Sequence, residues 1–149
     1  MSGAPATAFD PEAALRLDSQ LCFPLYAAAR KVTGLYAPLL KPLNLTYTQY
    51  IVMLVLWERD GVSVGEICEK LYLDSGTITP LLKKLEAAGY IHRQRSKADE
   101  RSVLIELTEA GRALKERARQ VPERVGSCLP LSPEQALELY SLLYTILRN

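Results

Sequence analysis

The apolar positions in the first third of the chain recur at the spacing of α-helices. Residues 11–40 are rich in alanine and leucine and predict one long helix, kinked at its internal prolines, that ends at the breakers Pro42 and Asn44. A Thr-x-x-Gln capping box at 46–49 precedes an apolar run at 51–57. Because this run is apolar almost all round, it predicts a second helix inside the core.

Two short helices follow, and a tight turn separates them. A second capping box at 63–66 opens a helix that ends near Leu71, and Asp74 or Ser75 caps a helix that stops at Gly89. Two short helices across a tight turn are typical of a helix-turn-helix.

Behind Gly89 the apolar period changes to the alternation of β-strands. Residues 91–95 and 102–107 predict two strands, and the charged residues 96–100 predict the turn between them. This pattern predicts a β-hairpin directly after the second helix of the helix-turn-helix.

Two more helices close the chain. Thr108 caps a helix predicted over 109–125, and a Ser-Pro-Glu-Gln box at 132–135 starts the last one. The whole order predicts a mainly α fold, a winged helix-turn-helix of about six helices with a small β-hairpin wing. The last helix has an apolar stripe that a small monomer would struggle to cover, so we expect a homodimer, with packing inside one chain as the alternative. The stripe consists of Ala136, Leu139, Tyr140, Leu143, Ile146 and Leu147.

The helix predicted to end at Gly89 has two contrasting faces. One face is apolar, with Ile78, Leu82 and Leu85 among its residues, and the other carries only small, hydroxylated or basic side chains. Small residues near a helix start permit close approach to base edges in the major groove, and lysines further along meet phosphates. Taken alone, the helix is equally compatible with a solvated surface helix. The residues expected to contact double-stranded DNA are Ser75, Gly76, Thr77, Thr79, Pro80, Lys83 and Lys84.

The predicted hairpin has a basic tip. Residues 92–97 carry three fixed positive charges and no acid. A basic tip suits the minor groove, where the negative potential attracts an inserted arginine, and Asp99 is placed to hold the guanidinium of Arg101. An exposed charged turn is the alternative for the hairpin alone, but its position behind the polar helix favours DNA. The wing residues expected at the DNA are Arg93, Arg95, Lys97, Asp99 and Arg101.

Composition narrows the choice of function further. The chain of 149 residues fits one domain, and no apolar run is long enough to span a bilayer, so we expect a protein without a membrane partner. The amino terminus lacks a signal pattern, which predicts a cytoplasmic protein. His92 is the only histidine, so no metal site is expected. No cofactor is expected either. A net charge of +1 neither supports nor excludes DNA binding, because binding depends on a local basic patch and not on the total charge.

We assign the single chain, 1–149, to two regions. Residues 45–108 form the predicted DNA-binding lobe, and residues 11–44 and 109–149 form a helical dimerisation region. The first ten residues or so are expected to be disordered.

A family resemblance agrees with this interpretation. Asp-Glu-Arg at 99–101, followed by Leu-Thr-Glu-Ala-Gly-Arg at 107–112, resembles the signature of MarR-type regulators. The resemblance extends over nearly the whole chain. It implies an obligate two-fold dimer whose closing helices build the interface, and it implies binding to operator DNA.

A narrower resemblance points to the branch of this family that senses organic hydroperoxides. The segments that carry it are 21–26, 35–36, 45–50 and 73–82. The resemblance implies that Cys22 is the peroxide-reactive thiol, that Tyr36 and Tyr47 hydrogen-bond its sulfur, and that Tyr26 lies close by. Phenolic donors near a helix start stabilise a thiolate, which is the form that reacts. Along one continuous helix Cys22 and Tyr36 would be about 21 Å apart, so they can meet only across the dimer.

Two further cysteines and three rival functions complete the expectations. Cys128 lies in the break before the last helix. The resemblance implies that it forms a disulfide with the oxidised Cys22 of the other subunit, and that this disulfide releases a repressor from DNA. The alternatives are that Cys128 is an idle loop cysteine or that an external thiol reacts with Cys22 instead. Cys68 is expected to be structural.

One alternative function is that of a MarR-type regulator that responds to a small aromatic ligand, which would have the same DNA-binding fold. A thiol peroxidase enzyme, or a scaffold that binds only proteins, leaves the basic hairpin without a role, so we expect a protein that is not an enzyme.

Overall fold

The structure of the protein, a computed structural model, describes residues 10–148. They fall into two compact units, the first ending at Gly34 and the second beginning at Leu35. Helix α2 (Cys22–Leu40) contributes residues to both units. The disorder expected for the amino terminus concerns residues that, apart from Asp10, lie outside the described range, and the assignment of 45–108 to a separate lobe stays a prediction.

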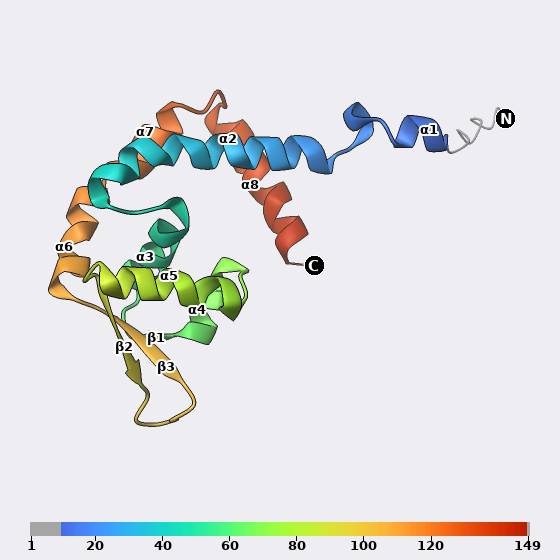
Figure 1. Ribbon diagram of the computed structural model, residues 1–149. Helices are drawn as coiled ribbons and strands as arrows, with labels where there is room; N and C mark the ends of the chain where they lie inside the picture. Colours follow the sequence, from blue (N-terminus) through green and yellow to red (C-terminus); the bar gives the residue numbers. More distant parts are fainter. Residues whose placement is uncertain (1–9, 149) are drawn as a thin grey trace. The chain divides into compact units, whose positions relative to one another are not determined.

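The first unit contains α1 (Pro11–Ala14), a 3-10 turn (Leu17–Ser19) and the start of α2 (Figure 1). The single helix predicted over 11–40 is therefore wrong before Cys22. Pro24 accounts for the break, because in a continuous helix its ring would collide with the carbonyl of Gln20, which is extended instead. Within the first turn of α2, the missing N–H of Pro24 leaves no bond unmade.

The second unit holds the predicted helix-turn-helix. Helix α3 (Tyr47–Glu58) starts at the Thr46 capping box, and α4 (Val64–Leu71) starts at a capping box formed by Ser63 and Glu66. Helix α5 (Ser75–Ala87) is capped by Asp74, and Gly89 follows it with a φ of +80°. The predicted helix starts and the glycine stop are confirmed.

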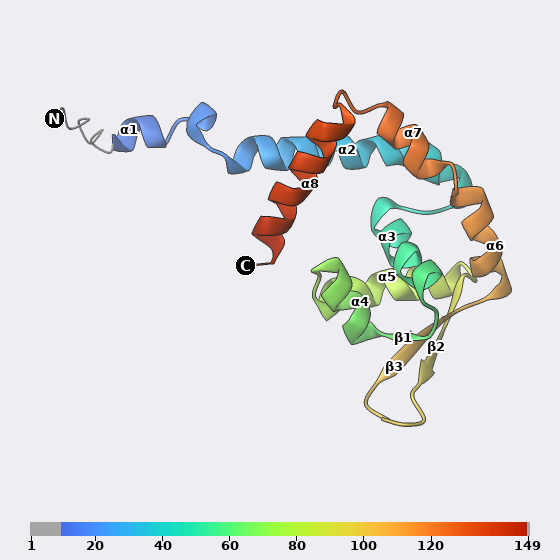
Figure 2. The same ribbon diagram turned by 180° about the vertical axis from the view of Figure 1, so that it is seen from behind.

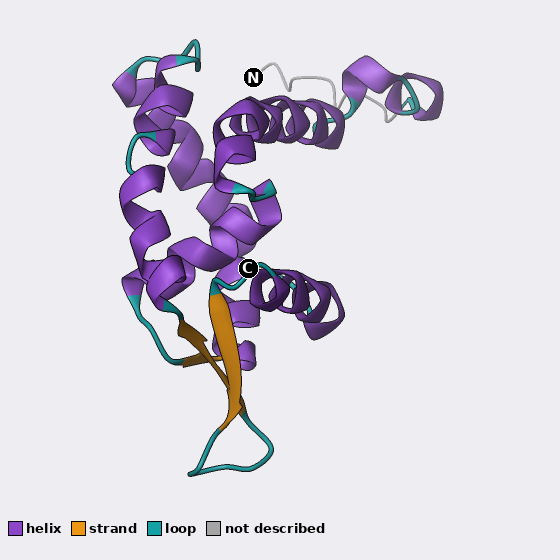
Figure 3. Ribbon diagram, turned by 60° about the vertical axis from the view of Figure 1, so that its left-hand side comes forward, coloured by secondary structure: helices purple, strands orange, loops and turns teal. Residues whose placement is uncertain are grey.

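The predicted hairpin is present as β2 (Ile91–Arg95) and β3 (Val103–Leu107), in antiparallel register. Figures 1 and 2 show both strands extending beyond helices α3, α4 and α5, and Figure 3 shows the loop at their tip. A third strand, β1 (Val62–Ser63), pairs with the other edge of β3. Sequence reasoning missed it because two residues are too few to show an alternation.

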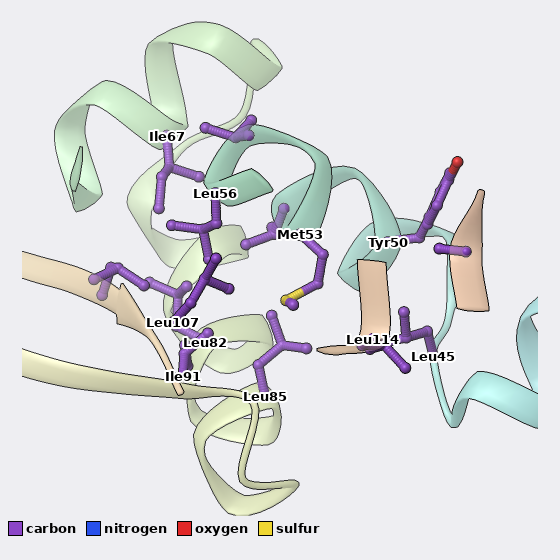
Figure 4. Close-up of a cluster of buried hydrophobic side chains, with 14 of the residues drawn as sticks. Leu45, Tyr50, Met53, Leu56, Ile67, Leu82, Leu85, Ile91, Leu107 and Leu114 are labelled. Carbon is purple, nitrogen blue, oxygen red and sulfur yellow. The ribbon is translucent and has the colours of Figure 1, made fainter. Parts of the chain in front are cut away.

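The core of the second unit lies between α3, α4, α5 and the base of the sheet (Figure 4). Met53 and Leu56 of α3 and Leu82 and Leu85 of α5 are at most 1% exposed. The apolar face predicted for α5 is therefore its buried face, and its polar face is left at the surface.

The carboxyl-terminal third forms α6 (Glu109–Ala118), α7 (Val121–Ser127) and α8 (Pro133–Leu147). The single helix predicted over 109–125 is wrong, because Pro122 cannot donate to the carbonyl of Ala118 and its ring would collide with that carbonyl. Residues 10–148 thus contain eight α-helices instead of about six, since two predicted helices are each divided.

Candidate nucleic-acid interface and thiol site

Helix α5 presents the polar face that the sequence predicts. Within it, Thr79 is half-buried and the other residues expected at DNA, from Ser75 to Lys84, are exposed. The Asp74 carboxylate accepts the Thr77 backbone N–H at 2.9 Å and its hydroxyl at 3.1 Å. Its hydrogen bonds with Thr77, backbone first, hold the pKa of Asp74 below its ordinary value. Asp74 therefore stays charged at the helix start and fixes the Thr77 hydroxyl.

The tip of the wing is organised by its own side chains and backbone. The Ser96 N–H donates to the Ser102 carbonyl at 2.8 Å, and the Ser96 hydroxyl oxygen accepts two backbone N–H groups of the loop. Asp99 accepts the backbone N–H of Arg101 at 3.0 Å and makes no ion pair with its guanidinium. The predicted Asp99–guanidinium contact is therefore corrected, because the nearer N–H two residues away closes the turn.

The basic side chains of the wing differ in what they contact. Arg95, Lys97 and Arg101 are exposed and form no ion pair within residues 10–148. Arg93 is bound instead to Glu86 of α5, with its Nε at 2.8 Å and its Nη2 at 2.7 Å from Oε2. The side-chain hydrogen bond from Arg93 holds the pKa of Glu86 below its ordinary value. Sequence reasoning missed Glu86, because no pattern along the chain shows which strand residue faces a helix.

A second carboxylate that the sequence did not single out joins the wing to α6. Asp60 accepts the Leu107 N–H at 2.8 Å and the Gly61 N–H at 2.9 Å through one oxygen, and the Arg112 Nη2 at 2.7 Å through the other. Burial raises the pKa of Asp60, but the hydrogen bonds from Leu107, Arg112 and Gly61 outweigh it and leave that pKa below its ordinary value. Sequence reasoning missed Asp60, because its partners Leu107 and Arg112 lie 47 and 52 positions further along the chain.

The phenols expected near the reactive thiol form a cluster in the second unit. The ring centroids of Tyr36 and Tyr47 are 4.8 Å apart, and Tyr50 lies 5.6 Å from Tyr36. Burial raises the pKa of Tyr36, and burial followed by the neighbouring Tyr36 raises that of Tyr47. Both phenols therefore keep their protons at neutral pH and remain hydrogen-bond donors.

The cysteines occupy different settings. Cys22 is exposed and is the first residue of α2, and Tyr26, one turn further on, is 60% exposed with the Arg30 guanidinium 5.6 Å from its ring centroid. Cys128 is exposed and caps the carboxyl end of α7, in the break where the sequence places it. Cys68 is half-buried and packs against the core.

Comparison with known proteins decides the family. The family model described as transcriptional regulator SarA/Rot matches residues 34–118, more than half of the chain. The chain belongs to this MarR-like family of transcriptional regulators. The resemblance inferred from residues 99–101 and 107–112 is thereby confirmed. Among the described residues, no helix is long and apolar enough to cross a membrane.

Individual members of this MarR-like family align over almost the full chain. The organic hydroperoxide resistance transcriptional regulator of Bacillus subtilis (strain 168) is 50% identical over 135 residues, covering 91% of this chain and 92% of that protein. The DNA-bound structure of reduced AbfR matches with a TM-score of 0.75 at 36% identity, covering 92% of this chain and 95% of that one. The disulfide form of AbfR, a protein of Staphylococcus epidermidis, matches with a TM-score of 0.64 at 36% identity, covering 93% and 96%. The chain is a DNA-binding transcriptional regulator with a winged helix-turn-helix.

Proposed function

We propose that this chain is a dimeric repressor that senses organic hydroperoxides through Cys22 and releases its operator when Cys22 forms a disulfide with Cys128 of the other subunit. The observation that carries the proposal is the exposed Cys22 at the first residue of α2, in a chain that is 50% identical to an organic hydroperoxide resistance regulator. The partial positive charge of a helix start favours an anion there, and a thiolate is the reactive form of cysteine.

The DNA interface of the proposal consists of the exposed face of α5 and the wing tip. The start of α5 offers Ser75, Gly76 and Thr79 to base edges, while Lys83 and Lys84 bind phosphates. Arg95, Lys97 and Arg101 enter or flank the minor groove. A relative that was solved on DNA, AbfR, matches 92% of this chain, which supports the assignment.

The chemistry proceeds in two balanced steps. The Cys22 thiolate attacks the terminal oxygen of the hydroperoxide and becomes a sulfenic acid, while the O–O bond breaks. The alkoxide that leaves takes a proton from solvent and becomes an alcohol. The Cys128 thiol of the other subunit then attacks the sulfenic sulfur, and a disulfide and water form. Before oxidation, the protonated phenols of Tyr36 and Tyr47 of the other subunit donate hydrogen bonds to the thiolate.

Release follows from the geometry that a disulfide demands. The two Cα atoms must lie within about 7 Å, so bond formation draws α2 of one subunit and the α7–α8 connection of the other together. Both elements belong to the dimerisation region of the proposal. In the proposal, α5 of each subunit is the recognition helix that enters the major groove. The two copies of α5 must match half-sites about 34 Å apart, so a change in their separation lowers operator affinity.

The test combines intact mass with DNA binding on the same samples. Wild type, Cys22→Ser, Cys128→Ser and, as a matched control, Cys68→Ser are treated with cumene hydroperoxide. We expect wild type and Cys68→Ser to lose the operator and to run as a covalent dimer without reductant. Cys22→Ser stays bound and unmodified, whereas Cys128→Ser gains one oxygen at Cys22 and forms no covalent dimer.

Each part of the proposal can fail separately. Release of DNA by oxidised Cys22→Ser would place the sensor elsewhere. A covalent dimer in Cys128→Ser would remove Cys128 from the resolving role.

A second candidate is a regulator that binds a small aromatic acid. A hollow of about 580 Å³ in the second unit has Lys41, Lys84 and Gln49 among its lining residues, which suits a carboxylate. In this case a benzoate-type acid would lower operator affinity while the intact mass stays unchanged, and Lys41→Ala would abolish the effect. Absence of any response to such acids removes this candidate.

A further inference from the structure

One ion pair connects α5, the proposed recognition helix, directly to the wing. The Arg93 guanidinium of β2 donates a hydrogen bond from Nε to Oε2 of Glu86 on α5 at 2.8 Å, and its Nη2 lies 2.7 Å from the same oxygen in an ion pair. The backbone N–H of Arg93 donates to the other oxygen, Oε1, at 3.2 Å. Both carboxylate oxygens therefore bind one strand residue, and each side chain is only 34% exposed.

This pair sits where the wing needs a second anchor. Arg93 is the third residue of β2, opposite Ile105, and Ile91 and Leu107 already fix the base of the hairpin in the core. A two-stranded hairpin beyond its packed base has little stability of its own. The bond to Glu86 holds β2 against α5 at the level of Ile105, the outermost buried position of β3.

Arg93 also differs from the other arginines of the wing in whether its charge is paired. Among the described residues, the guanidinium of Arg93 is neutralised within the chain, whereas those of Arg95 and Arg101 have no acidic partner. A guanidinium whose Nε donates to a carboxylate, with Nη2 in ion-pair contact with the same group, has fewer donors left for a phosphate. Arg93 and Arg95 are both predicted from the sequence to contact DNA, but their contacts within the described residues differ.

We propose that Glu86 and Arg93 are positioning residues, which lock the wing to α5 so that the major-groove and minor-groove contacts reach DNA together. The proposal rests on the DNA interface proposed above. Two elements held at a fixed separation bind without the cost of ordering one against the other. Arg93 thus acts on affinity through the placement of Arg95 and Arg101 and does not itself bind a phosphate.

The salt dependence of binding distinguishes a positioning residue from a phosphate contact. Removing one phosphate contact per subunit lowers the slope of log K against log salt by roughly two for a dimer. Removing a positioning pair leaves the number of phosphate contacts, and hence the slope, unchanged. The probe is a duplex that the wild-type protein selects from random DNA, titrated at several salt concentrations.

Four variants make the test, and all are first checked for folding by circular dichroism. Glu86→Gln combined with Arg93→Gln keeps the net charge and removes the pair; we expect a several-fold loss of affinity with the wild-type slope. Glu86→Gln alone is also expected to weaken binding. The exchange Glu86→Arg with Arg93→Glu restores a pair and is expected to recover part of the lost affinity. Arg95→Gln is the matched control, and its slope is expected to fall by roughly two.

The most informative result is whether Glu86→Gln weakens or strengthens DNA binding. If Arg93 contacts DNA directly, this variant frees its guanidinium and removes a negative charge near the phosphates, so binding becomes tighter and the inference is overturned. Wild-type affinity in the double Gln variant overturns it as well. If Arg95→Gln also leaves the slope unchanged, the proposed wing interface itself is wrong, which separates the two failures.

Discussion

Arg101 at the end of the wing loop is an exposed guanidinium whose backbone N–H is held by Asp99. We predict that Arg101→Ala weakens operator binding strongly and lowers the salt slope by roughly two per dimer, because one minor-groove or phosphate contact is lost from each subunit. Electrophoretic mobility shifts at several salt concentrations measure both quantities. Size-exclusion chromatography should show an unchanged dimer. Unaltered affinity would contradict the assignment of this loop to DNA.

Asp60 gives a prediction about pH. Its pKa is lowered in the folded chain, so its carboxylate adds stability above the pKa of an unfolded aspartate, about 3.9, and this contribution is lost as pH falls through the folded-state pKa. We expect Asp60→Asn to lower the free energy of unfolding by about 1 kcal/mol at pH 7 and by less at pH 3. Urea unfolding at fixed protein concentration measures this difference.

The exposed carboxylate of Asp18, which pairs with Arg16, serves as the control for Asp60. Asp18→Asn should change stability little at either pH, because exposed ion pairs contribute little. A loss in Asp60→Asn that is equal at both pH values would mean that its charge is not what stabilises the junction.

Single side chains mark the limit of what the sequence could predict here. The apolar set of α5 was predicted because its helical spacing repeats locally, and Asp74 was predicted as a cap because capping acts over three residues. The partners of Glu86 and Asp60 lie 7 and 52 residues away, and they depend on the register of β2 and on the packing of α6. No periodicity along the chain encodes such contacts.

At the level of elements, Gly111 on α6 has the least room for a side chain among the described glycines. A Cβ at this position would lie 2.1 Å from the Tyr90 carbonyl oxygen, which is backbone and cannot move aside as a side chain would. We therefore predict that Gly111→Ala lowers the free energy of unfolding by about 3 kcal/mol. Chemical denaturation is the measurement. Gly126→Ala in α7, where a Cβ meets open space, should be neutral or slightly stabilising.

Element boundaries followed the sequence wherever a cap or a stop acts alone. The predicted boundaries were wrong at Pro24 and Pro122. At both positions the apolar pattern continues, but the backbone cannot continue the helix. In both cases the spacing of apolar residues predicts a continuous helix, while the proline ring excludes the carbonyl four residues earlier. Before Cys22 a regular apolar face would also gain little, because side chains such as Leu15 and Leu17 stay exposed.

For the molecule as a whole, the stripe predicted on α8 is left uncovered by the described residues of the chain. No residue of α8 is buried, and Leu139, Tyr140 and Ile146 are 44%, 57% and 60% exposed. We predict that Leu139→Glu with Ile146→Glu gives a monomer that loses operator binding by at least a hundredfold, since one subunit contacts only one half-site. Analytical ultracentrifugation measures the mass. Glu138→Gln, on the same helix, is the control expected to stay dimeric.

The indole of Trp57, the single tryptophan of the chain, donates to the Gly111 carbonyl at 2.9 Å, and its ring lies 6.4 Å from that of Tyr50. Its emission therefore has one source, at the place where α3 meets α6 and next to the phenol cluster. Stretching this hydrogen bond shifts the emission wavelength without any added label. The protein thus carries its own optical probe, with which stopped-flow mixing can follow the joint between these helices as peroxide reacts.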